Sequence, residues 1–398
     1  MAGETTFFAH DDPRRQTLFV KDPFAYSLLE NWFFQNDMVA LSEEASGVVY
    51  MKNDLSNKVG DTMLFDLVNP LRGDGRGDRQ RLQGYSERLF VDNFELIVHE
   101  LGNSVEADSP LSEGRTRTKT TDIAERELMR WMSGKFETGC INAACGLYNW
   151  NTNIQIINEK EPSSNRIYYG GGPAAGGIST AVTQTDAALS AETPANYLMN
   201  TDVLRLMARK IELLEPGLIP IEREGQRVYP TLLHPLMVKA LEACTDWKDI
   251  QKHANVRGSK NPFFTNSLGK IKNLQLYSYA QLPMRTGAGS TTPAEGFFLD
   301  TPRTATDDAV ASGKTVAAGL ILGQRAICVG IKQMPQYYVD SMDGFTKKGR
   351  KPRIPWIGFD SQVGISKSRF KEYDPDTGAE TDREDYGTFT FHTQVVVD

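Results

Sequence analysis

The chain is poor in cysteine and histidine, and this scarcity excludes several classes of protein. Its 398 residues include four cysteines, which are too few and too scattered for a disulfide framework. Cys140 and Cys145 form one Cys-x4-Cys pair, but no second pair and no nearby histidine completes a metal site. The five histidines also lack metal-ligand spacing. We therefore expect no structural metal and no cofactor.

Long apolar runs and an excess of basic residues are missing as well. No run of about 18 apolar residues appears, and residues 1–5 do not begin a signal peptide, so we expect a soluble intracellular protein without a membrane partner. The formal net charge of -7 argues against a dedicated nucleic-acid binder, because such proteins neutralise phosphates with clustered basic residues.

Catalytic motifs are incomplete wherever they begin. Residues 312–315 read SGKT, but a phosphate-binding loop needs a glycine at position 308, which is Asp308. Residues 84–88 read GYSER, which places Arg88 where a nucleophile elbow needs its second glycine. Two Arg-Gly-Asp tripeptides, at 72–74 and 76–78, are better explained by a turn than by cell adhesion. We expect no enzyme activity.

What is present is a mixed α+β pattern long enough for two or three domains. Asp22 and Pro23 begin a short helix with Phe24 and Trp32 on one face, after twenty residues without periodicity. Asp122 and Glu125 form a capping box that begins a helix of roughly 40 Å, at about 1.5 Å per residue. We expect this helix over 122–148 and another, capped by Thr201, over 201–214.

The later half mixes strands with short helices. We expect strands at 228–233 and 274–280, helices at 236–244 and 247–254, a buried strand and helix within 316–331, and a closing strand at 386–397.

A long β-hairpin is the most informative feature. Met63 and Phe65 alternate on one strand face, and Phe94 and Leu96 alternate on a second strand. Between these strands, residues 71–84 read LRGDGRGDRQRLQG, which is typical of a charged hairpin tip. A two-stranded hairpin is marginally stable alone in water, so the hairpin needs a partner. Weak ion pairs of about 0 to 1 kcal/mol each become sufficient when symmetry repeats them in every subunit.

The order of these features resembles the major capsid proteins of Schitoviridae, the N-four-like podophages, and their relatives with the Hong Kong 97-type fold. The resemblance spans most of the chain. It rests on the motifs GDT at 60–62, LRGDGRGD at 71–78, LQG at 82–84, ERL at 87–89, VD at 91–92, residues 124–131, LHP at 233–235, Trp247, RG at 257–258, NPF at 261–263, LGQRA at 322–326 and DYG at 385–387.

The resemblance implies a division into named regions. These are an N-terminal arm (1–58), an E-loop (59–101), a peripheral domain (102–194) with a spine helix at 122–148, a mainly axial domain (195–340) and a return to the peripheral domain (341–398). It implies contacts between subunits through the E-loop residues Arg72, Asp74, Arg76, Asp78, Arg79, Arg81, Met63 and Phe65, and through the arm residues Phe19, Phe24 and Trp32. The basic cluster Lys347, Lys348, Arg350, Lys351 and Arg353 is expected to contact DNA or another subunit.

The implied function is a shell subunit that forms pentamers and hexamers of an icosahedral phage head around double-stranded DNA, held weakly and without sequence specificity. The implied partners are further copies, a separate scaffolding protein, a portal and a decoration protein. The chain would belong to the virion capsid and assemble in the host cytoplasm. An encapsulin-like nanocompartment and an unrecognised hydrolase using Ser86 remain alternatives.

Overall fold

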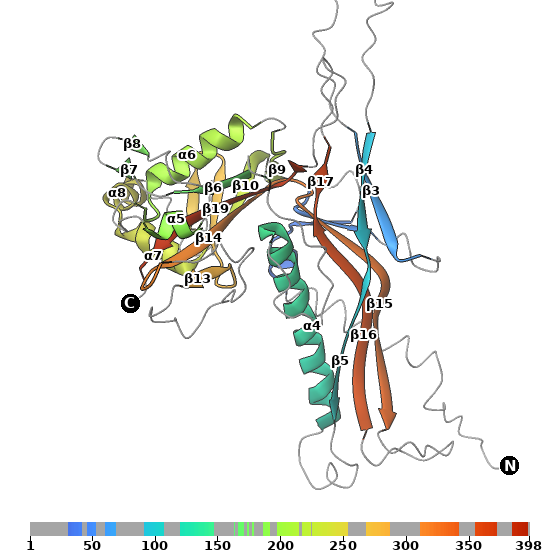
Figure 1. Ribbon diagram of the computed structural model, residues 1–398. Helices are drawn as coiled ribbons and strands as arrows, with labels where there is room; N and C mark the ends of the chain where they lie inside the picture. The colour runs from blue at the N-terminus through green and yellow to red at the C-terminus, as the bar shows by residue number, and fades with distance from the viewer. Residues whose placement is uncertain are drawn as a thin grey trace, which may run out of the picture.

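A computed structural model describes residues 31–41, 46–52, 60–68, 91–106, 120–146, 163, 166–170, 173–174, 177–178, 186–191, 197–214, 217–223, 225–253, 268–286, 311–341, 355–371 and 384–396. Two bodies lie side by side in these residues (Figure 1). One is elongated and contains a five-stranded sheet under a long helix, and the other is rounder and contains an eight-stranded sheet. No described helix has the length and apolar character needed to cross a membrane.

The elongated body is built on two long strands. Its sheet has the order β1 (Val39–Ala40), β2 (Val49–Lys52), β15 (Ile327–Ser341), β16 (Pro355–Lys367) and β5 (His99–Glu106). Helix α4 (Thr120–Cys145) runs along it (Figure 1). The helix buries Leu128, Met132 and Phe136 against the sheet at a spacing of four residues, which places them on one helix face.

The expected long helix is confirmed with shifted ends. It begins at Thr120, so Asp122 lies inside the first turn and does not cap the helix. It ends before Gly146, whose φ of +66° is the left-handed conformation that terminates helices. Gly134 lies within it without ending it, and a side chain there would meet nothing within 4 Å.

The rounder body surrounds the second sheet. That sheet has the order β11 (Gly269–Ile271), β12 (Leu274–Ser278), β10 (Gln226–Leu233), β14 (Thr315–Leu322), β19 (Thr388–Val395) and β6 (Ile167–Tyr169), while β9 (Ile221–Arg223) pairs with β10 and β13 (Met284–Thr286) with β14. Its helices are α5 (Asp186–Ala191), α6 (Thr201–Glu212), α7 (Pro235–Ala243) and α8 (Thr245–His253). A small pair, β7 (Pro173–Ala174) and β8 (Gly177–Ile178), lies at its margin.

Several expectations for this body are confirmed and two are wrong. Helix α6 is capped by Asn200, whose Oδ1 accepts from Val203 N at 2.9 Å, and Thr201 is its first residue. Residues 316–331 form parts of β14 and β15, with no helix. The eight residues of β14 are all buried, so their apolar run has the period of neither a strand nor a helix.

The division expected at residue 340 does not follow the sheets. Strand β15 belongs to the five-stranded sheet, and β19 belongs to the eight-stranded sheet. The chain therefore passes between the bodies twice in this part of the sequence, at 323–326 and at 368–387.

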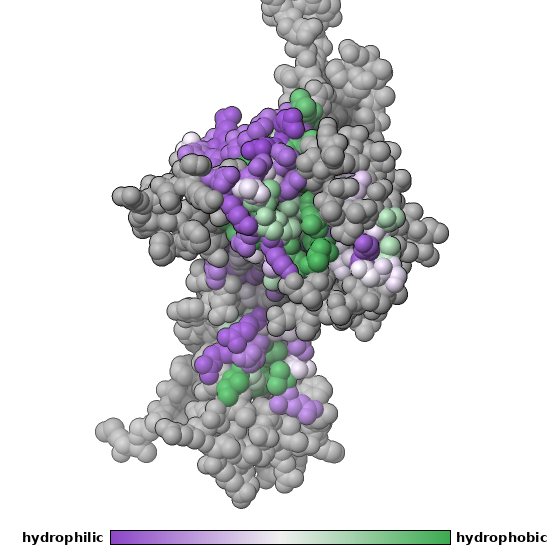
Figure 2. All heavy atoms as spheres, turned by 90° about the vertical axis from the view of Figure 1, so that its left-hand side faces the viewer, coloured by the Kyte–Doolittle hydropathy of each residue, from purple (hydrophilic) through white to green (hydrophobic). Residues whose placement is uncertain are grey.

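Seen from the side of the rounder body, the described surface is mainly polar, with apolar areas between the polar ones (Figure 2).

Candidate functional site

The expected hairpin forms a two-stranded stem at one end of the elongated body (Figure 1). Strands β3 (Thr62–Val68) and β4 (Val91–Ile97) pair antiparallel, with Thr62 opposite Ile97 and Val68 opposite Val91. Burial alternates strictly along β4, as the sequence pattern predicts. The predicted tip, residues 71–84, lies outside the described residues.

The stem rests on two glycines that face each other across the sheet. Gly330 of β15 pairs with Gly364 of β16, each at the centre of a Val-Gly-Ile tripeptide. The flanking valines and isoleucines point the opposite way, into the core under α4. The glycine face therefore carries no side chain at this position, and we call this place the glycine seat.

The stem fills the space that the two glycines leave open. A Cβ at Gly330 would lie 2.7 Å from Met63 Sδ and 2.9 Å from Leu96 Cδ2. A Cβ at Gly364 would lie 2.4 Å from the carbonyl oxygen of Ile97. Real Cβ atoms do not approach this closely, so the glycines are required for the observed approach of the stem.

A row of aromatic rings continues from the glycine seat toward the rounder body. Ring centroids are 5.7 Å apart for Tyr50 and Phe65, 5.6 Å for Phe65 and Phe94, 6.2 Å for Phe94 and Phe370, and 5.4 Å for Phe370 and Tyr386. Edge-to-face and tilted pairs at these distances are favourable. The inner face of the stem is thus part of the core of its own chain.

Hydrogen bonds fix the margins of the stem. Asp92 Oδ2 accepts from Lys371 N at 2.7 Å, and Val98 N donates to Asp61 O at 2.7 Å. Two lysines of the sheet reach stem carbonyls, Lys332 Nζ to Gly60 O at 2.7 Å and Lys52 Nζ to Leu64 O at 3.0 Å.

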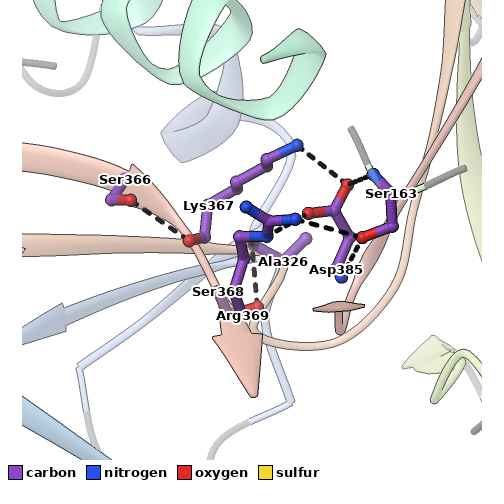
Figure 3. Close-up of polar contacts among 7 residues, drawn as sticks. All are labelled: Ser163, Ala326, Ser366, Lys367, Ser368, Arg369 and Asp385. Atoms are coloured by element: carbon purple, nitrogen blue, oxygen red, sulfur yellow. Dashed lines mark hydrogen bonds and ion pairs between the residues drawn. The ribbon is translucent and has the colours of Figure 1, made fainter. Parts of the chain in front are cut away.

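A buried cluster of charges lies where the chain passes between the two bodies (Figure 3). Lys367 at the end of β16 places its Nζ 2.8 Å from Asp385 Oδ2, and these two side chains are 0% and 1% exposed. Arg369 Nε lies 3.1 Å from Asp385 Oδ1. We call Lys367, Arg369, Asp385 and Ser163 the junction cluster.

The junction cluster connects strands of both sheets. Arg369 and Asp385 pair between β17 (Arg369–Phe370) and β18 (Glu384–Asp385). Ser163 N donates to Asp385 Oδ2 at 3.1 Å, and Asp385 N donates to Ser163 Oγ at 2.9 Å. Because Asp385 is close to the start of β19 and Lys367 ends β16, the ion pair joins the eight-stranded sheet to the five-stranded sheet.

A second connection between the two bodies is made through Trp32, the first residue of helix α2 (Trp32–Gln35). One carboxylate of α4, that of Glu137, accepts from Trp32 N at 3.1 Å through Oε2 and from the Tyr279 hydroxyl through Oε1. The Trp32 ring makes edge contacts with Tyr277 and Tyr279 at 5.3 and 5.6 Å. Burial and the charge of Glu137 raise the pKa of Tyr279, so its hydroxyl stays protonated and donates.

The structure describes three of the residues predicted for subunit contacts. Met63 and Phe65 are each 3% exposed and pack in their own chain, so neither offers a free side chain to a neighbour, and the expectation for these two is corrected. Trp32 is half-buried against its own core, so part of its side chain stays accessible and its subunit contact remains a prediction. Phe19, Phe24, the six charged tip residues (Arg72, Asp74, Arg76, Asp78, Arg79, Arg81) and the basic cluster at 347–353 lie outside the described residues.

The opposite face of the stem is exposed. Leu64, Val91 and Ile97 are 47%, 53% and 43% exposed. Strand alternation places these side chains on the face that does not touch the sheet. On this face the apolar side chains alternate with the exposed polar residues Asp66, Asn93 and Glu95, so the outer face of the stem is mixed in character.

The described residues offer little reactive chemistry. Cys140 and Cys328 are buried, and burial raises the pKa of both thiols, that of Cys328 to about 12. Burial lowers the pKa of His234 to about 4, and its Nδ1 accepts from Leu236 N at the start of α7. No described group of histidine, cysteine, aspartate and glutamate has the arrangement of a metal site. Ser86 lies outside the described residues.

The sequence predictions missed the glycine seat and the junction cluster. A signal for the seat was present, because a glycine inside a strand pattern marks a close approach and the same tripeptide occurs twice, at 329–331 and 363–365. The junction cluster had no comparable signal, since Lys367 and Asp385 come from segments that look solvent-exposed in sequence.

Comparisons with known proteins agree on one kind of protein. A family model described as "Phage capsid protein" matches residues 18–397. The capsid of Ralstonia phage GP4 matches with a TM-score of 0.67 and 19% identity, covering 92% of each chain. The capsid of Cyanophage Pam1 has a TM-score of 0.61 and 16% identity, covering 91% of this chain and 92% of that chain. The head of Helicobacter pylori bacteriophage KHP40 has a TM-score of 0.61 and 15% identity, covering 92% and 91%. No curated protein sequence matches.

Proposed function

Because the chain belongs to the phage capsid protein family, with the Hong Kong 97-type fold of a major capsid protein, we propose that it forms the pentamers and hexamers of an icosahedral head that encloses double-stranded DNA. The family is structural rather than enzymatic, and the encapsulin alternative is not favoured. Within the family, the sequence motifs favour relatives of the Schitoviridae.

The observation that carries the proposal is the two-sided stem. Its inner face is fixed by the glycine seat, and its outer face exposes Leu64, Val91 and Ile97. A hairpin held in this way presents residues 69–90 from a rigid base, so the charged tip residues can contact a neighbouring subunit. Each contact is weak, and the symmetry of a closed shell repeats it.

We assign the regions with boundaries that follow the sheets. The elongated body with α4 is the peripheral domain and now includes β15, and the rounder body is the axial domain and now includes β19. The stem belongs to the E-loop. The arm, through Phe19 and Phe24, contributes further subunit contacts.

The other partners follow from the shell function. A separate scaffolding protein, a portal and a decoration protein act with this subunit, and assembly takes place in the host cytoplasm before the protein becomes part of the virion. Packaged DNA is held weakly, with the basic residues at 347–353 as its contact or as a further subunit contact. The net charge of -7 disfavours strong binding to DNA.

The test is negative-stain electron microscopy with light scattering on the chain expressed with its neighbouring genes. Deletion of residues 71–84 is expected to abolish closed shells, whereas the control variant Glu127→Gln, on the exposed face of α4, is expected to retain them. A stable monomer at every concentration for the unmodified chain, with scaffold present, would refute the proposal.

A further inference from the structure

The edge of the five-stranded sheet offers a place for one more strand. Strand β5 ends the sheet and, among the described residues, pairs with β16 alone. Residues 102–106 of β5 are exposed, and the strand contains neither the lysine nor the proline that often protect an edge. Ser104 N donates to the adjacent Asn103 Oδ1 at 2.9 Å, a local bond that a strand partner can replace. Within the part of the chain that the structure describes, this edge has no second strand partner and is suited to β-augmentation.

The same edge carries unbalanced negative charge. Gly102 lies opposite Asp360 and Glu100 lies opposite Gln362, so both acids are on one face. Burial and the charge of Glu100 raise the pKa of Asp360. The ion pairs found among the described residues include neither acid, and Glu100 accepts a neutral hydrogen bond from Gln362 at 3.2 Å. A basic partner would relieve this repulsion.

Exposed apolar side chains also occur at this end of the molecule. Val105 of β5 is 36% exposed, and Ile123 in the first turns of α4 is 37% exposed. In the narrow lower part of the molecule, green apolar atoms are visible among purple polar ones (Figure 2). An added strand would cover part of this apolar surface.

One segment of the chain matches the edge in length, charge and β-propensity. Residues 14–21 read RRQTLFVK, with three basic residues, no acid and four consecutive β-compatible residues, between Pro13 and Pro23. The segment has eight residues, and so does β5. The hairpin tip fits less well, because residues 71–84 contain four glycines and two aspartates.

We propose that residues 14–21 of a second copy of the chain add to the edge of β5 in the assembled shell. Alternate residues of a strand share a face, so either Arg14 or the pair Arg15 and Lys21 faces Glu100 and Asp360. This rests on the proposed shell function, because it requires a neighbouring copy. It gives the N-terminal arm a defined receptor on the peripheral domain.

Cysteine cross-linking in assembled shells tests the proposal. Leu18→Cys and Phe19→Cys are each combined with Asn103→Cys or Ser104→Cys, since successive residues of a strand point to opposite faces. Cys244 is replaced by serine throughout, because the other native cysteines are buried and Cys244 is half-buried. Oxidised shells are expected to give covalent multimers on denaturing gels for at least one pair. Glu127→Cys on the exposed face of α4 replaces the β5 cysteine as the matched control and is expected to give none.

Each other outcome overturns the proposal in a distinguishable way. Intact shells without any cross-link would show that the edge has another occupant, and the shell function would stand. A cross-link within one chain would assign the edge to the arm of the same copy. A cross-link from Arg76→Cys, with none from residues 18 and 19, would assign it to the hairpin tip. Absence of shells for the unmodified chain would remove both the shell function and this inference.

Charge reversal supplies an independent measurement. Arg14→Glu/Arg15→Glu and Glu100→Lys/Asp360→Lys are each expected to reduce the yield of shells, and their combination is expected to restore most of it. Equal loss in the combined variant would exclude the proposed pairing of charges.

Discussion

The glycine seat and the junction cluster both hold one pair of strands against another, but by opposite means. At the seat, Gly330 and Gly364 provide contact by having no side chain, and no charge takes part. At the junction, Lys367 and Asp385 are fully buried and provide contact through charge. An added side-chain atom is therefore expected to disrupt the glycine seat, whereas removal of a charge is expected to disrupt the junction cluster.

The difference concerns specificity as much as strength. Taking two charges out of water costs free energy that their attraction only partly returns, so a buried pair is weak evidence of added stability. It strongly penalises any arrangement that separates the two partners, however. The junction thus favours one relative position of the two sheets, while the seat sets how closely the stem approaches its own sheet.

The largest expected effect comes from removing the central acid of the junction. Asp385→Asn leaves the fully buried Lys367 and the partly buried Arg369 without their counter-charge, and we expect a loss of about 3 to 5 kcal/mol in the free energy of unfolding. Urea unfolding of the unassembled chain measures it. Glu127→Gln is the matched control, because its pair with Arg130 at 3.2 Å is exposed and should matter by less than about 1 kcal/mol.

A second substitution at the junction separates pairing from packing. Lys367→Met/Asp385→Asn removes the buried cation together with the acid, so this double variant should be more stable than Asp385→Asn alone. A double variant that is no more stable than Asp385→Asn would show that the pair acts mainly by packing.

The next effect comes from adding one carbon to the seat. In Gly364→Ala the new Cβ meets the backbone oxygen of Ile97 at 2.4 Å, and backbone cannot turn away as a side chain can. We expect a loss of about 3 kcal/mol, with the stem displaced from the sheet. Urea unfolding gives the size of the loss, and increased hydrogen exchange over residues 91–98 would locate it. Gly134→Ala on α4 is the control, since its Cβ meets nothing within 4 Å. Unchanged exchange would contradict the role assigned to the seat.

Local pattern predicted most of the individual elements. Helix α4, helices α6 to α8 and strands β3, β4, β10, β12 and β19 occur where periodicity and turn residues indicated them. The pattern correctly predicted a buried strand within 316–331, which is β14, but it predicted a helix where β15 begins, because a continuous apolar run does not distinguish a buried strand from a helix.

Sheet membership and the buried charges could not be predicted in this way. The exchange of β15 and β19 between the two bodies depends on pairings such as Ala318 with His392, which are distant in sequence. Met63 and Phe65 have the apolar character of contact residues, and only their position shows that the contact is with their own chain. Lys367 has the sequence surroundings of a surface residue, and its burial follows from its meeting Asp385.

A smaller effect is expected at the other glycine of the seat. In Gly330→Ala the close atoms are Met63 Sδ and Leu96 Cδ2, which are ends of flexible side chains. We expect a loss of about 1 to 2 kcal/mol, less than for Gly364→Ala. Adding Met63→Val, which removes the sulfur from the contested space, should make the combined loss smaller than the sum of the single losses. Urea unfolding of all four proteins gives the coupling, and additive losses would place the strain elsewhere.

The smallest effect is expected at Lys332, an exposed lysine that hydrogen-bonds to the backbone just before the stem. Lys332 Nζ donates to Gly60 O at 2.7 Å at the surface, so water replaces the lost bond in Lys332→Met, and we expect a change of about 0.5 kcal/mol in unfolding free energy. The stem should stay in place, because the glycine seat and the aromatic row do not involve this lysine. Urea unfolding and hydrogen exchange over residues 61–68 check both statements. A loss above about 2 kcal/mol with faster exchange would mean that exposed hydrogen bonds, rather than close packing on two glycines, hold the stem. The stem would then, like the junction cluster, depend on a charged side chain.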